Sequence, residues 1–266
     1  ARRSGVSSDT LTFPLRPAWR HEGGTPRQAW SGPAKWDAYS GNAGLQSMRN
    51  FDPCYFVTVA GGLVYYGSSH DNAVHALDAA TGKERWVFFT EAPVRLPPTI
   101  HEGTAFAGSD DGTLYALEAT SGKMMWKDRG APEDRRIPSN ASLISLWPVR
   151  TAPLVTNEAL YYTASLTPWE SSWLICLDPR TGDRRFTREV GGVTFQGALL
   201  ANVNTIIAPQ GRSAPLLYDI ATGLPAGTIG HAGGVFCLVT EDNELITGPS
   251  SQKPKDSQLL LTNAEG

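Results

Sequence analysis

Cysteine, charge and long apolar runs are all scarce in this chain, and each scarcity excludes a class of protein. The 266 residues include only 3 cysteines, too far apart for a C-x-x-C pair, a haem-attachment motif or an adjacent cysteine pair. Charged residues make up 18%, the net charge is −3, and no basic run marks a nucleic-acid-binding surface. No apolar run approaches the ~18 residues that a membrane-spanning helix requires.

Motifs for metal binding and catalysis are missing as well. The 5 histidines are scattered, and no H-x-x-x-H, EF-hand, G-x-S-x-G or P-loop motif occurs. The stretches SSHDN (68–72) and SDDG (109–112) carry carboxylates, but both lie at expected turns, where Asp, Asn and Gly are favoured. We therefore predict no metal site, and we interpret the cysteines as small buried residues.

A repeated stretch dominates what the sequence does contain. ALDAATGKERW (76–86) returns as ALEATSGKMMW (116–126) and CLDPRTGDRRF (176–186), with a weaker copy at 217–227 and a truncated one ending at Gly266. The turn glycines are separated by 40, 60, 41 and 43 residues: Gly82, Gly122, Gly182, Gly223 and Gly266. With 27 glycines and 19 prolines in the chain, a period near 40 predicts short strands, tight turns and a β-propeller.

Each position of the repeat has a structural task. The alternation in AVHAL (73–77) predicts a strand, the aspartate accepts N–H bonds at a turn, and the glycine adopts the left-handed conformation of a bulged hairpin. A small residue at the head allows an aromatic from a neighbouring blade to pack on its backbone, and an aromatic strut ends the motif. The predicted docking residues are Trp19, Ala76, Trp86, Ala116, Trp126, Cys176, Phe186, Gly82, Gly122, Gly182 and Gly223.

Further strands precede each copy of the repeat. Strand pairs are expected in 61–72, 102–112 and 157–166, and PVRLPPTI (93–100) matches PVRTAPLV (148–155). Each unit thus holds about four strands, which is one propeller blade. The sequence predicts an all-β fold, a β-propeller of four-stranded antiparallel blades with about five blades in this chain.

The pattern A-x-D-x-x-T-G-K-x-x-W resembles the tryptophan-docking repeat of the pyrroloquinoline-quinone (PQQ) propeller superfamily. Similar repeats occur in quinoprotein alcohol dehydrogenases and in the barrel-assembly propeller lipoprotein of the bacterial outer membrane. The resemblance covers roughly residues 52–266 and is specific in two copies. WD-repeat and kelch propellers share the shape but carry different struts. The resemblance implies an exported bacterial protein, periplasmic or extracellular.

The ends of the chain leave two interpretations of the ring. We divide the chain into 1–50, an N-terminal strand plus a Trp/Gly-rich loop that packs on the propeller, and 51–266, the repeats. FPLRPAWR (13–20) looks like an outer strand that either completes the last blade of a five-bladed ring or belongs to a segment of a seven- or eight-bladed propeller. The start without Met and the incomplete last repeat favour the segment, with more blades in a longer parent chain.

Two insertions interrupt the period, in 21–46 and 128–147. Insertions in repeat proteins gather as loops on one face, which is often the binding face. The first carries Trp30 and Trp36, which suit stacking on a sugar or peptide, although a loop that only caps the propeller explains them too. The second carries charges at 133–136, which we interpret as a solvated cluster.

Two arginines are the sharpest binding candidates. The repeat register gives five residues equivalent places near the start of each innermost strand: Cys54, Arg95, Arg150, Phe195 and Val235. These places ring the central channel, where Arg95 and Arg150 are candidates to clamp a carboxylate or phosphate. The alternative is structural pairing with acids of adjacent loops, such as Asp110, Asp111 or Asp71.

We expect a non-catalytic exported scaffold that binds a protein or polysaccharide through its loop face, with no cofactor. The alternative is part of a PQQ- and calcium-dependent quinoprotein oxidoreductase acting on alcohols or sugars. For such enzymes the resemblance implies a carboxylate and an amide on calcium, a catalytic aspartate and a vicinal disulfide. No stretch of this chain matches those motifs, so no catalytic residue is assigned.

Overall fold

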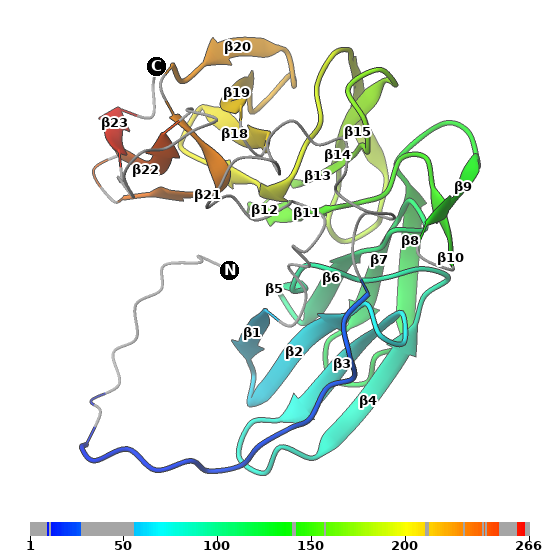
Figure 1. Ribbon diagram of the computed structural model, residues 1–266, viewed down its shortest axis with the longest axis vertical. Coiled ribbons are helices and arrows are strands. Elements are labelled where there is room, and N and C mark those ends of the chain that lie inside the picture. The colour runs from blue at the N-terminus through cyan, green and yellow to red at the C-terminus, as the bar shows by residue number, and fades with distance from the viewer. Residues whose placement is uncertain are drawn as a thin grey trace, which may run out of the picture.

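The computed structural model describes residues 10, 12–27, 56–139, 142–156, 158–210, 213–230, 232–240, 242, 244–249 and 260–263. Within these residues the regular elements are all β-strands, joined by turns and bends. Five antiparallel sheets of three or four strands follow one another around an arc in Figure 1, from β1–β4 in cyan to β21–β23 in orange and red. The predicted all-β propeller of four-stranded antiparallel blades is confirmed.

The strands of each blade pair in the order in which they occur in the chain. Blade 1 consists of β1 (Val57–Ala60), β2 (Leu63–Ser68), β3 (Ala73–Asp78) and β4 (Glu84–Phe89). Blade 2 consists of β5 (Thr99–His101), β6 (Thr104–Gly108), β7 (Thr113–Glu118) and β8 (Met124–Arg129). Blade 3 consists of β12 (Leu154–Val155), β13 (Leu160–Ala164), β14 (Ser172–Leu177) and β15 (Arg184–Val190).

The remaining strands form two more blades and two smaller pairs. Blade 4 consists of β17 (Leu200–Ala201), β18 (Thr205–Gln210), β19 (Ser213–Asp219) and β20 (Pro225–Thr228), and blade 5 of β21 (Ala232–Val239), β22 (Glu244–Pro249) and β23 (Leu260–Asn263). A separate hairpin is made by β9 (Arg136–Ser139) and β10 (Ser142–Ser145), and β11 (Thr151–Ala152) pairs in parallel with β16 (Gly197–Ala198).

The hairpin turn of the repeat follows from local chemistry. In blade 1 the carboxylate of Asp78 accepts the N–H groups of Ala80 at 3.1 Å and Thr81 at 2.9 Å. The Gly82 N–H donates to the Asp78 carbonyl at 2.8 Å, and the register between β3 and β4 shifts between Ala76 and Leu77. A comparable shift recurs at the same place in blades 2, 3 and 4. The repeated sequence therefore builds the same bulged turn each time.

The struts of blades 1, 2 and 3 each lie on the turn glycine of the next blade. A Cβ atom added to Gly122 would lie 2.6 Å from Cδ2 of Trp86, and Gly82 stands in the same relation to Trp19. Trp126 covers Gly182, and Phe186 covers Gly223. Trp86 also lies in one apolar cluster with residues of both blades 1 and 2, so the strut joins two sheets into one core.

The small residue at the head of the repeat lies opposite the strut of its own blade. Ala76 lies directly opposite Trp86 of its own blade, and Cys176 lies opposite Phe186 in the same way, as Ala116 does with Trp126. The aromatic that reaches across from the neighbouring blade rests on the glycine. The small side chain therefore leaves room for the strut of its own blade.

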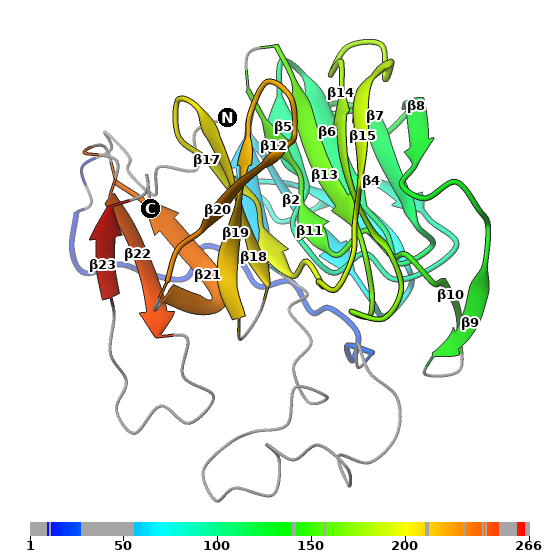
Figure 2. The ribbon, with the colours of Figure 1, turned by 90° about the horizontal axis from the view of Figure 1, so that it is seen from above.

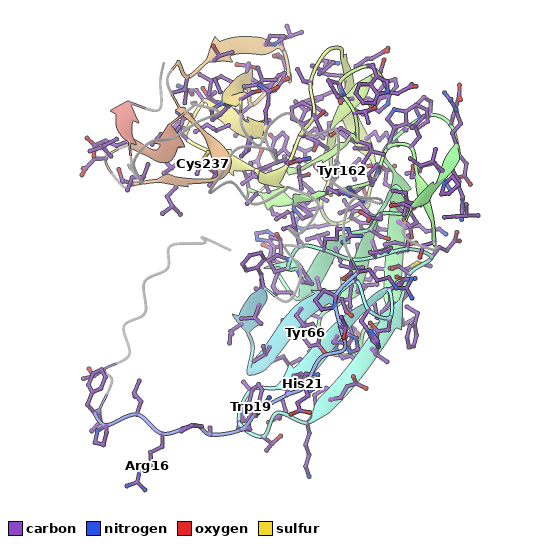
Figure 3. All side chains as sticks on the ribbon, viewed as in Figure 1. Arg16, Trp19, His21, Tyr66, Tyr162 and Cys237 are labelled. Atoms are coloured by element: carbon purple, nitrogen blue, oxygen red, sulfur yellow. The ribbon has the colours of Figure 1, made fainter. Side chains whose placement is uncertain are left out.

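An N-terminal strap, residues 12–27, runs along blade 1 without forming the strand expected over 13–20. Pro14 and Pro17 lack the N–H donors that a strand ladder needs. Trp19 still acts as a strut, because its Nε1 donates to the Ala79 carbonyl at 3.0 Å. Figure 3 shows Trp19 and His21 of the strap against this blade, where His21 Nε2 lies 2.8 Å from the Tyr66 hydroxyl.

Substituting Gly122 by Ala is expected to lower the free energy of unfolding. Gly122 has φ = 72°, a conformation that costs other residues about 1–2 kcal/mol. The new methyl group also displaces the Trp86 ring, so the total loss exceeds that figure. Urea denaturation measures it. The matched control is Gly103→Ala, where φ is 77° but no atom lies within 4 Å of the added Cβ, and an equal loss in both variants would contradict the docking contribution.

Candidate functional site

One end of the propeller is held together by contacts between consecutive blades. This loop face carries the β2–β3, β6–β7 and β13–β14 turns and the connections that lead from one blade to the next. Val94 N–H donates to the Ser68 carbonyl at 3.2 Å, and the equivalent Val149 N–H donates to the Ser109 carbonyl at 3.0 Å. The turns of one blade therefore fix the connection that enters the next, and with it the arginine that follows each valine.

The two equivalent arginines meet at one buried carboxylate. Arg95 Nε donates to Asp110 Oδ2 at 2.7 Å, while Arg150 Nε and Nη2 donate to its two oxygens at 2.7 and 2.8 Å. Asp110 is 1% exposed, Arg95 4% and Arg150 8%. The strap joins this cluster, because Arg95 Nη1 donates to the Arg27 carbonyl at 2.8 Å.

The charges of the cluster decide its chemistry. Burial alone raises the pKa of Asp110, but the positive charges of Arg150 and Arg95 outweigh it and hold that pKa below its usual range. Both guanidinium groups therefore bind one ionised carboxylate. Both arginines thus bind an acid of an adjacent loop, which is the structural pairing considered above as the alternative to ligand binding. An anionic ligand would have to compete with Asp110 for them.

The other candidate residues fall in three groups. Phe195, at the place equivalent to Arg95, is buried. Its ring packs edge to face with that of Tyr218, and the two ring centroids are 6.1 Å apart. Trp30, Trp36 and Cys54 lie outside the described residues, as does the side chain of Val235. The stacking and channel roles assigned to these four residues stay predictions.

The second insertion folds into the β9–β10 hairpin, which sequence reasoning left as a charged loop. Figure 2 shows this hairpin projecting from the loop face. Ile144 of β10 is buried against Ala92 and Leu166, which belong to a blade connection and to the β13–β14 turn. Arg136 binds Glu91 at 2.6 Å, and Arg135 lies 4.0 Å from Glu170. The hairpin is therefore anchored to two neighbouring segments, the connection between blades 1 and 2 and the β13–β14 turn.

Three exposed apolar side chains lie within two residues of these anchoring residues along the chain. Trp169, in the β13–β14 turn, is 80% exposed, and Leu143 of β10 is 56% exposed. Phe89, which ends β4 two residues before Glu91, is 63% exposed. We name these three residues the hairpin patch. Sequence reasoning missed Trp169, although the turn that carries it, 165–171, is longer than the equivalent turn at 109–112.

The described residues contain no group of three or more His, Cys, Asp or Glu residues placed to hold a metal. The buried carboxylate of Asp110 has both oxygens occupied by guanidinium groups, whose charge repels a cation. Asp111 accepts the Thr113 N–H and the Tyr115 hydroxyl, so it stabilises its own turn.

Comparison with known sequences gives one family. The sequence profile of a family described as "Outer membrane protein assembly factor BamB" matches residues 19–209. No curated protein sequence matches significantly. Among the described residues, no helix has the length and apolar character needed to cross a bilayer.

Comparison with solved structures gives propellers of several kinds. A quinohemoprotein alcohol dehydrogenase from Comamonas testosteroni has a TM-score of 0.58 and 15% identity over 73% of this chain. The quinohemoprotein alcohol dehydrogenase ADHIIG from Pseudomonas putida HK5 has a TM-score of 0.58 and 14% sequence identity over 73% of this chain. The computationally designed Ika8 protein has a TM-score of 0.57 and 13% sequence identity. The match covers 79% of this chain and 57% of the Ika8 chain. The chain spans 39% and 38% of the two dehydrogenases, and these identities show a common fold alone.

Proposed function

Because the chain belongs to the family of outer membrane protein assembly factor BamB, we propose that it is an exported propeller scaffold that binds a protein partner through its loop face. The observation that carries the proposal is the hairpin patch, in which an 80% exposed tryptophan stands beside an anchored hairpin. Tryptophan is strongly enriched among the residues that dominate binding energy at protein interfaces. An exposed tryptophan on a rigid support loses little conformational entropy on binding.

The same family supports a proposal for the place of the protein in the cell. The description of the family refers to outer-membrane assembly, so we place this chain on the periplasmic side of that membrane. A protein partner is supported better than a polysaccharide. The sugar hypothesis depended on Trp30 and Trp36, whereas the apolar hairpin patch lies next to the ion-paired Arg136, a combination found in protein interfaces.

The oxidoreductase alternative has no comparable support. Likeness to the solved dehydrogenases, at 15% identity, concerns the fold, and a fold hosts many unrelated activities. The buried carboxylate of Asp110 is bound by Arg95 and Arg150, so it is not free to hold a cation.

Site-specific photo-crosslinking tests the proposed function. A photoreactive amino acid replaces Trp169 in the full-length protein, expressed in its own cells, and crosslinked partners are identified by mass spectrometry. We expect a crosslink to a protein of outer-membrane assembly, and in the purified pair we expect Trp169→Ala to weaken binding at least tenfold without a change in melting temperature. The control position is Leu224, which is 54% exposed in the β19–β20 turn at the opposite end of the blades. Equal crosslinking from both positions, or none from 169, would contradict the proposal.

A further inference from the structure

Arg27, the last described residue of the strap, contacts three different parts of the loop face. Its N–H donates to Ser69 Oγ at 2.8 Å, and its carbonyl accepts from Arg95 Nη1 at 2.8 Å. Its guanidinium group reaches the β9–β10 hairpin, because Nη1 donates to Ser142 Oγ at 2.7 Å. In Figure 2 the strap, in blue, reaches the end of the sheets from which this hairpin projects. The backbone of Arg27 therefore binds blade 1 and a buried arginine, whereas its side chain binds the hairpin.

The contact with the hairpin is made near its tip. Ser142 is the first residue of β10 and directly follows the turn that joins the two strands. Contacts nearer the base are made by Ile144, which is buried in an apolar cluster, and by Arg136 of β9. The Ser145 N–H also donates to the Asp110 carbonyl at 2.8 Å. Arg27 thus adds the strap as a further anchor, at the end of the hairpin opposite these contacts.

The position of Leu143, a residue of the hairpin patch, depends on this anchor. Successive side chains of a strand point to opposite sides. Ser142 and Ile144 are bound to the rest of the protein, and Leu143 between them is 56% exposed. A hairpin of two strands is only marginally stable without further packing. Fastening Ser142 therefore helps to hold Leu143 in place relative to Trp169.

The strap itself is well suited to detach from blade 1. Its described residues form no strand, and 12–18 are exposed. Trp19, His21 and Thr25 make its other contacts with blade 1, through Gly82, Tyr66 and an exposed histidine of the β2–β3 turn. Segments that bury little apolar surface open at a lower free energy than the central strands of a sheet. The hairpin is thus fastened by an element that is less stable than the blades.

We propose that the strap regulates the hairpin patch: the docked strap holds the hairpin in place through Arg27, and the detached strap leaves it free to move. In this role Arg27 is a positioning residue. The effect on partner binding rests on the function proposed above, whereas the coupling between strap and hairpin does not. A patch that is already ordered loses less conformational entropy on binding, so the docked strap strengthens binding of the partner. By linkage, the bound partner strengthens docking of the strap by the same factor.

Hydrogen–deuterium exchange of the free full-length protein tests the coupling without any partner. We expect Arg27→Ala to speed exchange in 136–139 and 142–145 by about tenfold, with unchanged exchange in β13 and β14. Arg27→Lys keeps a side-chain donor, so we expect a smaller increase of about threefold. The matched control is Arg20→Ala, because Arg20 forms an ion pair with Glu22 of the strap itself. This variant is expected to leave exchange in the hairpin unchanged.

Two further variants separate release of the strap from loss of one local hydrogen bond. Trp19→Ala removes the strut at the far end of the strap, and we expect it to speed exchange in the hairpin by about threefold. Ser142→Ala is expected to act like Arg27→Ala, and the double variant is expected to exchange no faster than either single variant. Unchanged exchange in the hairpin of Arg27→Ala or of Trp19→Ala would overturn the inference.

Binding of the partner found by crosslinking tests the regulation. We expect Arg27→Ala to weaken binding by about fivefold, Arg20→Ala to leave it unchanged, and the partner to slow exchange in 19–27 of the parent by about fivefold. If the parent binds no partner through Trp169, the proposed function fails and the coupling in the free protein stands or falls by its own exchange data. If the partner binds the parent and Arg27→Ala equally well, the regulation is overturned while the proposed function stands.

Discussion

Replacing Asp110 by Ala is expected to lower the free energy of unfolding by about 3–5 kcal/mol, the range found when one partner of a buried ion pair is removed. Arg95 and Arg150 both donate to this carboxylate, and both are buried beneath the loop face. Without it, both guanidinium groups lose the carboxylate that they share, in surroundings that screen charge poorly. Chemical denaturation of the full-length protein at pH 7 measures the loss.

A control variant separates the loss of charge balance from the loss of packing. In Asp110→Leu/Arg95→Met/Arg150→Met all three charges are removed, and we expect it to be more stable than Asp110→Ala because apolar replacement of a whole buried ion cluster is often neutral. If Asp110→Ala unfolds at the same denaturant concentration as the parent, the cluster is not the buried, coupled unit described above.

Acid provides a second readout of the same cluster. The folded-state pKa of Asp110 is depressed below its usual value, so its contribution to stability is present above about pH 4, the pKa of an unfolded aspartate, and is lost as the pH falls further. We expect the parent to lose more stability between pH 5 and pH 2 than the triple variant, in which this group is absent.

Substituting Trp86 by Ala is expected to lower the free energy of unfolding by about 3–5 kcal/mol, as is usual for the truncation of a large buried aromatic side chain. Trp86 is 8% exposed and belongs to a cluster of residues from blades 1 and 2. Its removal leaves a cavity at the junction and takes one donor from the Ala119 carbonyl. Thermal and urea unfolding measure the effect.

Two comparisons sharpen this prediction. Trp86→Phe keeps one aromatic ring, and we expect it to lower the free energy of unfolding by less than half as much as Trp86→Ala does. Met124→Ala, a truncation of a 43% exposed side chain two positions before a strut, is expected to change stability by less than about 0.5 kcal/mol. A loss at Trp86 no larger than that at Met124 would contradict the role of the indole as a strut between sheets.

The repeat made most of the fold predictable, because the residues that determine each turn, bulge and strut lie within a few positions of one another in every copy. Asp78, Gly82 and Trp86 specify a turn, a bulge and a strut through interactions a few residues long or with the next blade. Wherever the same letters recur, the same geometry recurs. The strap is the exception: a strut residue, Trp19, led to the expectation of a strand, and two prolines prevent it.

The candidate site was less predictable because it depends on which of several like residues meet. Three acids were possible partners for the arginines, and sequence spacing does not rank them. In the structure, Asp71 is engaged by His75 and Asp111 by its own turn, which leaves Asp110 for both guanidinium groups. The exposure of Trp169 and the anchoring of the β9–β10 hairpin arise from contacts between segments far apart in sequence, which no single motif encodes.

Hydrogen–deuterium exchange on the full-length protein, free and bound to the partner identified by crosslinking, tests the central claim most directly. The account predicts at least tenfold slower exchange on binding in 136–139, 142–145 and 165–171, which form and surround the hairpin patch, with unchanged exchange in the β12–β13 and β17–β18 turns. Slowed exchange confined to those turns, or none in the hairpin, would contradict a scaffold that binds its partner through the loop face.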